Sequence, residues 1–479
     1  MSFDALPTEF DNRILALLDH DSLNAMSRTS KMYRMVTEPF LYRHIELNSG
    51  SGVGIRWLVV TLLSRPELAA YTKTIKCLKT EWSSVEKDAN SQGTRHPSVS
   101  LERLIDKLRI TTSDTLGSDA DVAKLRVAWM GAILADDHID GSLALIASLA
   151  HNIESITVAD KVRQGAITSY YGELLTLVMW EAFNHSYLDS SKSGNSMTTS
   201  QGERPFSKLH HLHLETQSPA QIANLPSLRT LHIEGWDDIS VSPKFPTGIL
   251  HQLQTLELID ICCNAEQIQG ILSEGQATRL RSLVLRKFSP FRDSCQLIIN
   301  TLIKDCPGLE NLELDVVEWN DVEGLNKPLK GLASLTSLST LRIDLDSLAD
   351  CSNKNALLKL DTMLPPNLRA LHVTGINEAE FMDFLEPFLD ASQGHPDLDN
   401  LYQIAGRFFF KEVTITIDFS LHLGRVWAFL RSSINDIVNQ LQKLHGLLLQ
   451  VYGLEKGLDR EPKLFADQTG CCQDISFED

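Results

Sequence analysis

The sequence has none of the short motifs that mark the common enzyme classes. GxSxG of serine hydrolases, GxxxxGKS/T of phosphate-binding loops, HExxH of zinc proteases and GxGxxG of dinucleotide-binding folds are all missing. An enzyme needs a nucleophile with a base, a phosphate loop or a set of metal ligands. We therefore expect that the chain is not an enzyme and has no catalytic residues and no cofactor.

Basic residues are too few to balance the acidic ones. The 479-residue chain has 62 Asp and Glu against 44 Lys and Arg, a formal net charge of −18. Non-specific binding to nucleic acid or to an anionic membrane requires a positive surface. The charge balance argues against both and favours a neutral or basic protein partner.

The chain also lacks a cysteine framework and a long hydrophobic run. Its eight cysteines include no CxxC pair, which is typical of reduced thiols in an intracellular protein. Its largely apolar stretches, such as residues 57–63, are far short of the roughly 20 residues that cross a bilayer. No signal-peptide pattern opens the sequence. We expect a cytoplasmic or nuclear protein with no membrane partner.

One leucine pattern recurs along much of the chain. It consists of Leu, two variable residues, Leu, one variable residue, and then Leu, Ile or Val. The first leucines of successive copies are 19 to 30 residues apart, a spacing typical of leucine-rich repeats. The seven copies are Leu209-Leu212-Leu214, Leu228-Leu231-Ile233, Leu253-Leu256-Leu258, Leu280-Leu283-Leu285, Leu309-Leu312-Leu314, Leu338-Leu341-Ile343 and Leu368-Leu371-Val373.

The repeats predict an α/β fold built as a solenoid, with a parallel sheet on the concave side and helices on the convex side. Because side chains alternate along a strand, the second and third leucines should enter the core, and the residue between them should face the concave surface. Helical spacing of apolar residues predicts convex helices at residues 266–272, 295–304 and 378–389. Residues 306–314 resemble the strand entry of the cysteine-containing leucine-rich repeats.

Weaker copies extend the array at both ends. Residues 153–158 and 413–417 each fit a strand, and residues 75–78 fit one less well. Residues 421–455 have helical periodicity and predict a cap over the open end of the solenoid. The tail at 456–479 has no period and predicts disorder. The chain thus divides into a helical module at 1–47, a linker and solenoid entry with mobile loops at 48–148, the solenoid at 149–420 with a loop at 185–205, the cap and the tail.

The first 47 residues follow a different pattern, that of three short helices. Pro7 sits where the first helix begins. Asp21 or Ser22 can cap the second helix, Ser30 can cap the third, and Pro39 should end it. A unit this small is not expected to be stable alone, so it should pack on the solenoid or on a partner.

This module resembles the F-box family in the order of its residues. Residues 6–18 look like the opening helix, and residues 21–31 are similar to the second helix with the serine-and-lysine turn after it. Residues 39–45 look like the closing segment of the fungal version, where a tyrosine stands in for tryptophan. The resemblance implies docking to the Skp-type adaptor of a cullin ubiquitin ligase. The candidate adaptor-facing residues, each of which could instead belong to the core of the module, are Leu6, Pro7, Ile14, Leu15, Leu18, Leu23 and Met26.

The residues between and after the core leucines form the candidate substrate surface. Six of these fourteen positions are acidic and two are arginines, which favours a basic segment of a substrate protein. The alternative is that an acidic protein simply has acidic exposed positions. The fourteen are His213, Glu215, His232, Glu234, Glu257, Ile259, Val284, Arg286, Glu313, Asp315, Arg342, Asp344, His372 and Thr374.

Three histidines gather on this surface. His211 and His213 share one strand face, and His232 is equivalent to His213 in the next copy. Imidazoles on neighbouring strands, about 4.8 Å apart, could converge on an ion such as zinc. No cysteine or carboxylate with ligand spacing completes the set. We therefore expect no metal and assign these side chains to contacts with a partner.

Together these features predict a non-catalytic substrate-recognition subunit of an SCF-type cullin ubiquitin ligase, as the F-box resemblance implies. The F-box would bind the adaptor, and the repeats would bind the substrate protein. The alternative is a leucine-rich repeat scaffold that works without a ligase, with the N-terminal helices serving only as the first cap of the solenoid. Exposure of the apolar face of those helices in the absence of a partner discriminates between the two.

Overall fold

The computed structural model describes only part of the chain. Predictions for the loop at 185–205, for the helix at 378–389, for residues 421–447 of the cap and for Leu6 and Pro7 fall outside the described residues. The chain forms two compact units, Met1–Leu253 (unit 1) and Gln254–Asp479 (unit 2). The described residues are 8–48, 52–79, 106–110, 123–134, 139–160, 175, 178–179, 206–215, 225–235, 251–261, 265–274, 277–288, 293–316, 329–344, 363–377, 412–419, 448–455 and 463–466.

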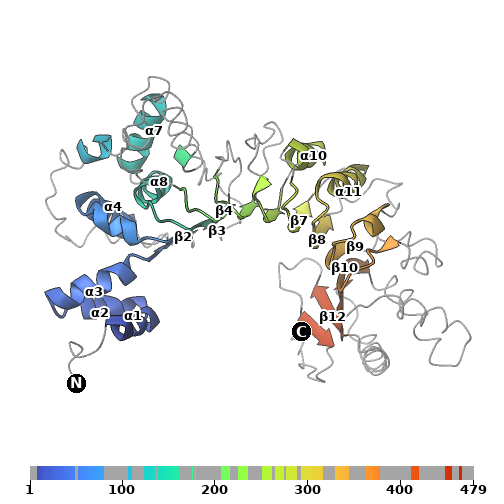
Figure 1. Ribbon diagram of the computed structural model, residues 1–479, viewed down its shortest axis with the longest axis horizontal. Coiled ribbons are helices and arrows are strands. Elements are labelled where there is room, and N and C mark those ends of the chain that lie inside the picture. Colours follow the sequence, from blue (N-terminus) through green and yellow to red (C-terminus); the bar gives the residue numbers. More distant parts are fainter. Residues whose placement is uncertain are drawn as a thin grey trace, which may run out of the picture. The chain divides into compact units, whose positions relative to one another are not determined.

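Three short helices open unit 1 (Figure 1): α1 (Thr8–Leu17), α2 (His20–Ser27) and α3 (Lys31–Leu41). The cap predicted for α3 is confirmed, because Ser30 Oγ accepts a hydrogen bond from Tyr33 N at 3.1 Å. The cap predicted for α2 was wrong. Asp19, rather than Asp21 or Ser22, is the capping residue, and its carboxylate accepts from Ser22 N at 2.7 Å.

Pro39 lies inside α3 and does not end it, contrary to the prediction. The proline ring holds φ near the helical value, and the missing N–H removes only one bond from the last turn. The helix continues to Leu41, and Tyr42 N still donates to Glu38 O at 3.1 Å. A proline this close to the helix end therefore leaves the last turn intact.

Among the described residues, unit 1 has five parallel strands in chain order: β1 (His44–Asn48), β2 (Thr74–Lys79), β3 (Ser155–Asp160), β4 (His211–Glu215) and β5 (Thr230–Glu234). Each strand is hydrogen-bonded to the next. Strand β1 was not predicted. Its alternation of buried Ile45 and Leu47 with exposed His44 and Glu46 was the available sequence signal. The parallel sheet therefore begins directly after the three helices.

Four further helices of unit 1 are α4 (Gly52–Ser64), the 3-10 helix η2 (Pro66–Tyr71), α7 (Ala123–Leu134) and α8 (Ile139–Leu149). Trp129 of α7 is fully buried and donates from Nε1 to Gly141 O at 2.9 Å. Helix α8 is buried from Leu143 to Ala147. The described parts of 48–148, which were predicted to be a linker and solenoid entry, therefore include strand β2 and helices that contribute buried side chains to the core of unit 1. None of the helices in the described ranges is long and apolar enough to span a bilayer.

The strands described in unit 2 are β6 (Thr255–Ile259), β7 (Ser282–Phe288), β8 (Asn311–Val316), β9 (Thr340–Asp344), β10 (Ala370–Asn377), β11 (Glu412–Phe419), β12 (Leu448–Glu455) and β13 (Lys463–Ala466). Strands β6 to β12 pair in parallel in chain order, and β13 pairs antiparallel with β12. Helices α10 (Ala265–Glu274) and α11 (Asp293–Asp305) lie side by side on one side of the strands (Figure 1), where helices were predicted. The short η5 (Leu332–Ser334) precedes β9.

The C-terminal end of unit 2 differs from the prediction. Residues 448–455, assigned to a helical cap, form β12, and residues 463–466 of the expected disordered tail form β13. The apolar run that starts at Leu448 and Leu449 is compatible with a helix or a strand. Residues 448–455 form a strand because they pair in parallel with β11. The strand predicted at 413–417 is confirmed as β11.

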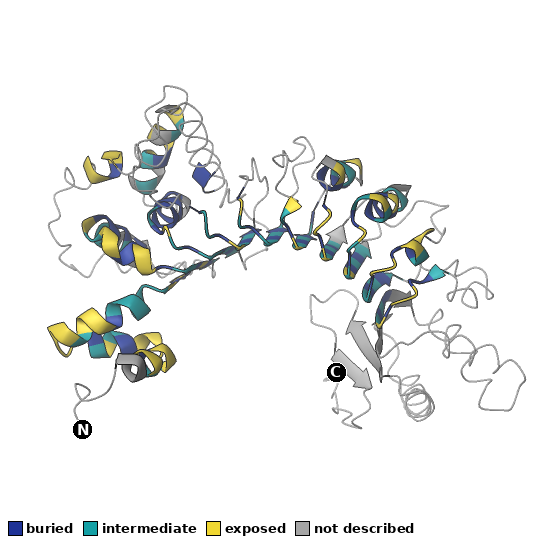
Figure 2. Ribbon diagram, in the orientation of Figure 1, coloured by how far each residue is buried: buried dark blue, intermediate teal, exposed yellow. Residues whose placement is uncertain are grey.

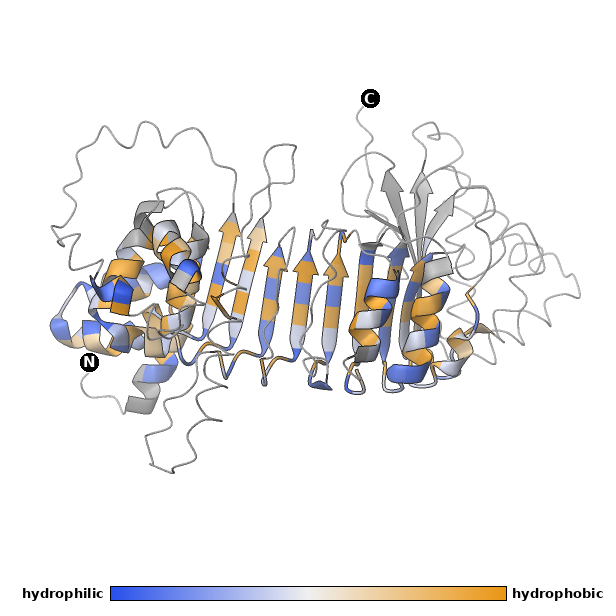
Figure 3. Ribbon diagram, turned by 90° about the horizontal axis from the view of Figure 1, so that it is seen from above, coloured by the Kyte–Doolittle hydropathy of each residue, from blue (hydrophilic) through white to orange (hydrophobic). Residues whose placement is uncertain are grey.

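The predicted burial of the repeat leucines is confirmed in all seven copies. Each of the three pattern residues in a copy is at most 7% exposed. The intervening strand residues are less buried, so the strands appear striped in burial (Figure 2) and in hydropathy (Figure 3). Buried side chains of α11, such as Ile298 and Leu302, add to the same core.

The turn that precedes strands β2 to β5 and β7 to β10 also repeats. At β7 the N–H groups of Arg281 and Ser282 both donate to Gln254 O, at 2.8 and 2.9 Å. The same pair of bonds joins the start of β2 to Arg43 O, at 2.9 and 3.2 Å. Strand β2, where the leucine pattern is weak, therefore begins with the same backbone hydrogen bonds as the repeats in which the pattern is strong.

The three-helix module is tied to the rest of unit 1 through Arg65, which lies between α4 and η2. Its Nη1 and Nη2 donate to the two carboxylate oxygens of Glu38 in α3, at 2.6 and 2.8 Å. These hydrogen bonds lower the pKa of Glu38 below its usual value. Because the chain also passes directly from α3 into β1, the module is attached at the first strand.

Replacing a core leucine should destabilise the repeats far more than replacing its strand neighbour. Leu256 is fully buried, so Leu256→Ala should lower the free energy of unfolding by about 2–5 kcal/mol. Thr255→Ala, at a half-buried position of the same strand, should cost less than about 1 kcal/mol. Urea unfolding followed by circular dichroism measures both. Equal losses would contradict the observed orientation of β6.

Candidate functional site

The strand residues that alternate with the buried leucines form a second face, which we call the variable face. It consists of the fourteen positions predicted above. Thirteen of them are half-buried and Thr374 is buried. On this face the structure brings together two clusters of charged or titratable side chains, one within each unit.

The cluster of unit 2 centres on Glu313 of β8. Arg286 of β7 donates from Nη2 to Glu313 Oε2 at 3.0 Å and also contacts the other carboxylate oxygen through Nε. Arg342, the register partner of Glu313 on β9, places its Nε 3.2 Å from Glu313 Oε1. The Glu313 side chain is only 13% exposed, so it forms both ion pairs in a partly desolvated position. These bonds to Glu313 raise the pKa of Arg286.

His372 continues this row of side chains on β10, opposite Arg342. Burial, and secondarily the positive charge of Arg342, lower the pKa of His372 to about 4. The imidazole is therefore neutral at physiological pH. It offers a partner a hydrogen-bonding ring rather than a charge.

The two arginines predicted on the variable face both lie next to Glu313. Their guanidinium groups flank its carboxylate and balance its charge locally. Four carboxylates and two guanidinium groups share this part of the variable face, which keeps an excess of negative charge. The four carboxylates belong to Glu257, Glu313, Asp315 and Asp344.

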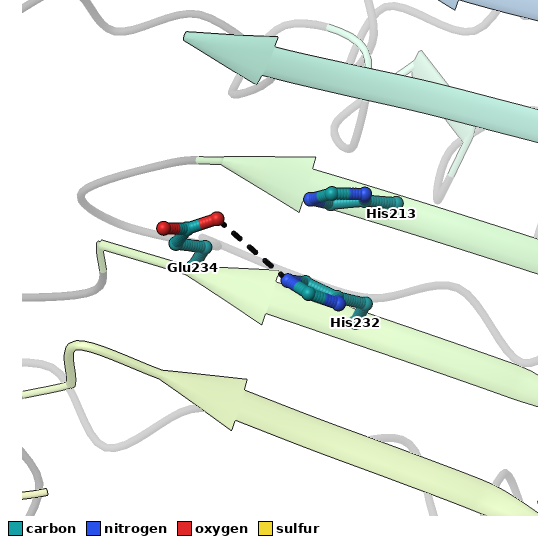
Figure 4. A group of neighbouring side chains, drawn as sticks. All are labelled: His213, His232 and Glu234. Atoms are coloured by element: carbon teal, nitrogen blue, oxygen red, sulfur yellow. Dashed lines mark ion pairs between the residues drawn. The ribbon is translucent and has the colours of Figure 1, made fainter. Parts of the chain in front are cut away.

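The cluster of unit 1 consists of His213 on β4 with His232 and Glu234 on β5 (Figure 4). His213 and His232 are register partners, and their ring centroids are 3.8 Å apart with a tilt of 32°. Glu234 lies two residues after His232 on the same face, with Oε2 3.8 Å from His232 Nε2. The expectation that no carboxylate completes the histidine set was wrong, because Glu234 does so. His211 is not part of the group.

The residues assigned to the adaptor surface fall into two groups. Leu15 and Leu23 are buried inside the three-helix module, at 2% and 5% exposure. They therefore stabilise the module itself, and membership of its core is the alternative that the sequence analysis gave for these residues. Ile14, Leu18 and Met26 are half-buried and can contact a partner.

Sequence reasoning missed the most exposed apolar side chains of the module. Leu17 of α1 is 86% exposed, and Met32, Met35 and Val36 of α3 are 54%, 66% and 39% exposed. The three residues of α3 are spaced i, i+3 and i+4, so they lie on one face of the helix. This spacing could have predicted an apolar face from the sequence. We call these four residues the apolar patch.

The described cysteines do not suggest a reactive thiol. Cys77, Cys295 and Cys306 are buried. Burial raises the pKa of the Cys306 thiol to about 12, and the nearby Asp305 carboxylate adds to the shift. A thiol in such a site stays protonated at neutral pH and acts as a small apolar side chain.

Comparisons with known proteins do not assign the chain to a family. No protein-family model matches the sequence, and no curated protein matches it at a significant level.

Glu313→Gln should destabilise the fold, because it leaves two partly buried arginines without their carboxylate. We expect a loss of about 2 kcal/mol, less than the roughly 3–5 kcal/mol of a fully buried pair, since the Arg286 side chain is 42% exposed. Glu310→Gln on the same chain segment is the matched control. It breaks only the exposed pair with Arg281 and should cost less than about 1 kcal/mol. Urea unfolding of the two variants should separate them, and equal losses would rule out a structural role for the network.

Proposed function

We propose that this protein is a leucine-rich repeat receptor with an N-terminal F-box. In this role it is the non-catalytic substrate-recognition subunit of an SCF-type cullin ubiquitin ligase. The three-helix module docks on the Skp-type adaptor, and the variable face of the repeats holds the substrate protein. The ligase supplies the transfer chemistry, so the chain itself needs no catalytic group.

The observation that carries this proposal is the apolar patch on α1 and α3. A small helical module normally buries its large apolar side chains, yet Leu17 and Met35 are mostly exposed in this one. A neighbouring protein that covers Leu17, Met32, Met35 and Val36 would remove this apolar surface from water. The half-buried residues of the predicted adaptor surface can enlarge such an interface: Ile14 lies on α1, Leu18 directly follows it, and Met26 lies on α2.

The attachment of the module supports a receptor that positions its substrate. Two hydrogen bonds from Arg65 to the Glu38 carboxylate attach α3 to the segment between α4 and η2. The chain also passes directly from α3 into β1, so the module is attached to the strands of unit 1 at two points. Such an attachment would keep a substrate bound on the strands of unit 1 close to the adaptor. Transfer then gains from a raised local concentration of the substrate lysine.

The alternative is a scaffold that works without a ligase and uses the three helices only to cover the first strand. Contacts of α3 with β1 and η2 are compatible with such a cap. A cap, however, has no need for apolar side chains that point away from the strands it covers. The exposure of Met32 and Met35 therefore favours docking to a partner.

Charged substitutions in the apolar patch should abolish adaptor binding without unfolding the protein. Leu17→Asp and Met35→Asp place a carboxylate in the proposed interface, so we expect at least a tenfold loss of affinity for a Skp-type adaptor. Val127→Asp, at a 72% exposed position of α7, is the matched control and should bind normally. Pull-down with purified adaptor, together with thermal unfolding of each variant, tests this. Retained binding by folded Leu17→Asp and Met35→Asp would favour the scaffold.

Neutralising the carboxylates that flank the arginine network should weaken capture of a basic substrate. Glu257→Gln with Asp344→Asn leaves Glu313 and both arginines in place but reduces the negative charge of the variable face. Capture of bound proteins from a lysate should then fall, and its sensitivity to salt should decrease, because screened attraction contributes less. Quantitative mass spectrometry at two salt concentrations measures this. Unchanged capture would mean that the carboxylates do not select the substrate, while adaptor binding serves as the internal control.

A further inference from the structure

We propose that His213, His232 and Glu234 form a binding site for a divalent transition-metal ion, with Zn²⁺ as the fitting example. The site lies entirely within unit 1, on the variable face of β4 and β5 (Figure 4). It does not depend on the proposed ligase function. Three observations support it: the strand register, the separation of the donor atoms and the chemistry of the donor set.

The register brings the three side chains to one point of the sheet. His213 and His232 are direct partners across two parallel strands, and Glu234 follows His232 at a spacing of two. Side chains two residues apart on a strand share a face, so all three project from the same side. Leu212 and Leu214 are buried, so His213 between them projects from the opposite face of the sheet.

The donor atoms are nearly close enough for one ion. One ligand atom from each residue lies within 4.8 Å of the other two, and His232 Nε2 is 3.8 Å from Glu234 Oε2. Zinc bonds of about 2.0–2.2 Å in tetrahedral geometry place donors about 3.4 Å apart. Binding of one ion would therefore require the stacked imidazoles to rotate about their side-chain bonds, so that their lone pairs face a common point.

The donor set selects the class of ion. Two imidazoles with one carboxylate suit zinc and its neighbours in the transition series, whereas calcium and magnesium prefer oxygen ligands alone. The side chains of His232 and Glu234 are 14% and 28% exposed, so an ion would be partly shielded from water. Glu215 is the register partner of Glu234, and a divalent cation would offset the repulsion between these two carboxylates.

Three protein ligands leave at least one coordination position open. In zinc proteins such a position takes water or an external donor. On the variable face the external donor can be a histidine, cysteine or carboxylate of a bound protein. The site would then contribute a metal-mediated contact to partner binding.

Metal uptake by the full-length, untagged protein tests the proposal. Equilibrium dialysis against Zn²⁺ should give one tightly bound equivalent that the double variant His213→Gln and His232→Gln loses. Glu234→Gln keeps the size of the side chain and should weaken binding at least tenfold, because even changes to outer-shell partners of a metal cost that much. His210→Gln removes an exposed histidine at the start of the same strand and is the matched control, with unchanged uptake.

Cobalt provides a second readout. Co²⁺ bound by the wild-type protein should give the visible absorption of a four- or five-coordinate site, and the double variant should not. Circular dichroism verifies that each variant is folded. If the wild-type protein binds no zinc, or if folded variants bind as much as the wild type, the three residues form a stacked histidine pair with a neighbouring carboxylate and no metal site.

Discussion

The rest of this structure depends on burying the repeat leucines between the parallel strands and the segments that cover them. One strand of five or six residues cannot remove three leucines from water alone, but each copy covers its neighbours when strands stack in chain order. Within each unit the result is a row of leucine, isoleucine and valine side chains with almost no exposure. The paired turn bonds at the starts of β2 to β5 and of β7 to β10 hold the register that makes this possible.

A fixed register has a consequence for the opposite face. Side chains on that face lie in columns with neighbours about 4.8 Å away, so each charge interacts closely with the side chains on the adjacent strands. Around Glu313 the arrangement is an ion-pair network with two arginines, whose attraction offsets part of the desolvation cost of the half-buried carboxylate. Around His213 and His232 it is a stacked imidazole pair beside Glu234. Both arrangements are consequences of strand stacking, and both are positioned for contact with another molecule.

The N-terminal module obeys a different constraint, since it is too small to bury all its apolar side chains. Leu15 and Leu23 fill its interior, while Leu17 and Met35 remain outside. Attachment through Arg65 and Glu38 supplies stability that three short helices lack. The module can therefore present apolar surface and remain folded, a combination that suits docking to a partner.

The sequence by itself determined the repeats and the burial of their leucines, because a period of two in a short apolar pattern allows one orientation once a face is buried. It also determined α10, α11 and the cap at Ser30 from local chemistry. Strand β12 was decided by tertiary structure, since a short apolar run fits a helix or a strand until a neighbouring strand offers hydrogen bonds. Tertiary structure also decided the ion-pair partners of Glu313 and the position of Glu234 beside the His213–His232 pair. Which side chains become neighbours across strands depends on the strand register, and the paired segments are about 20 to 30 residues apart in the sequence.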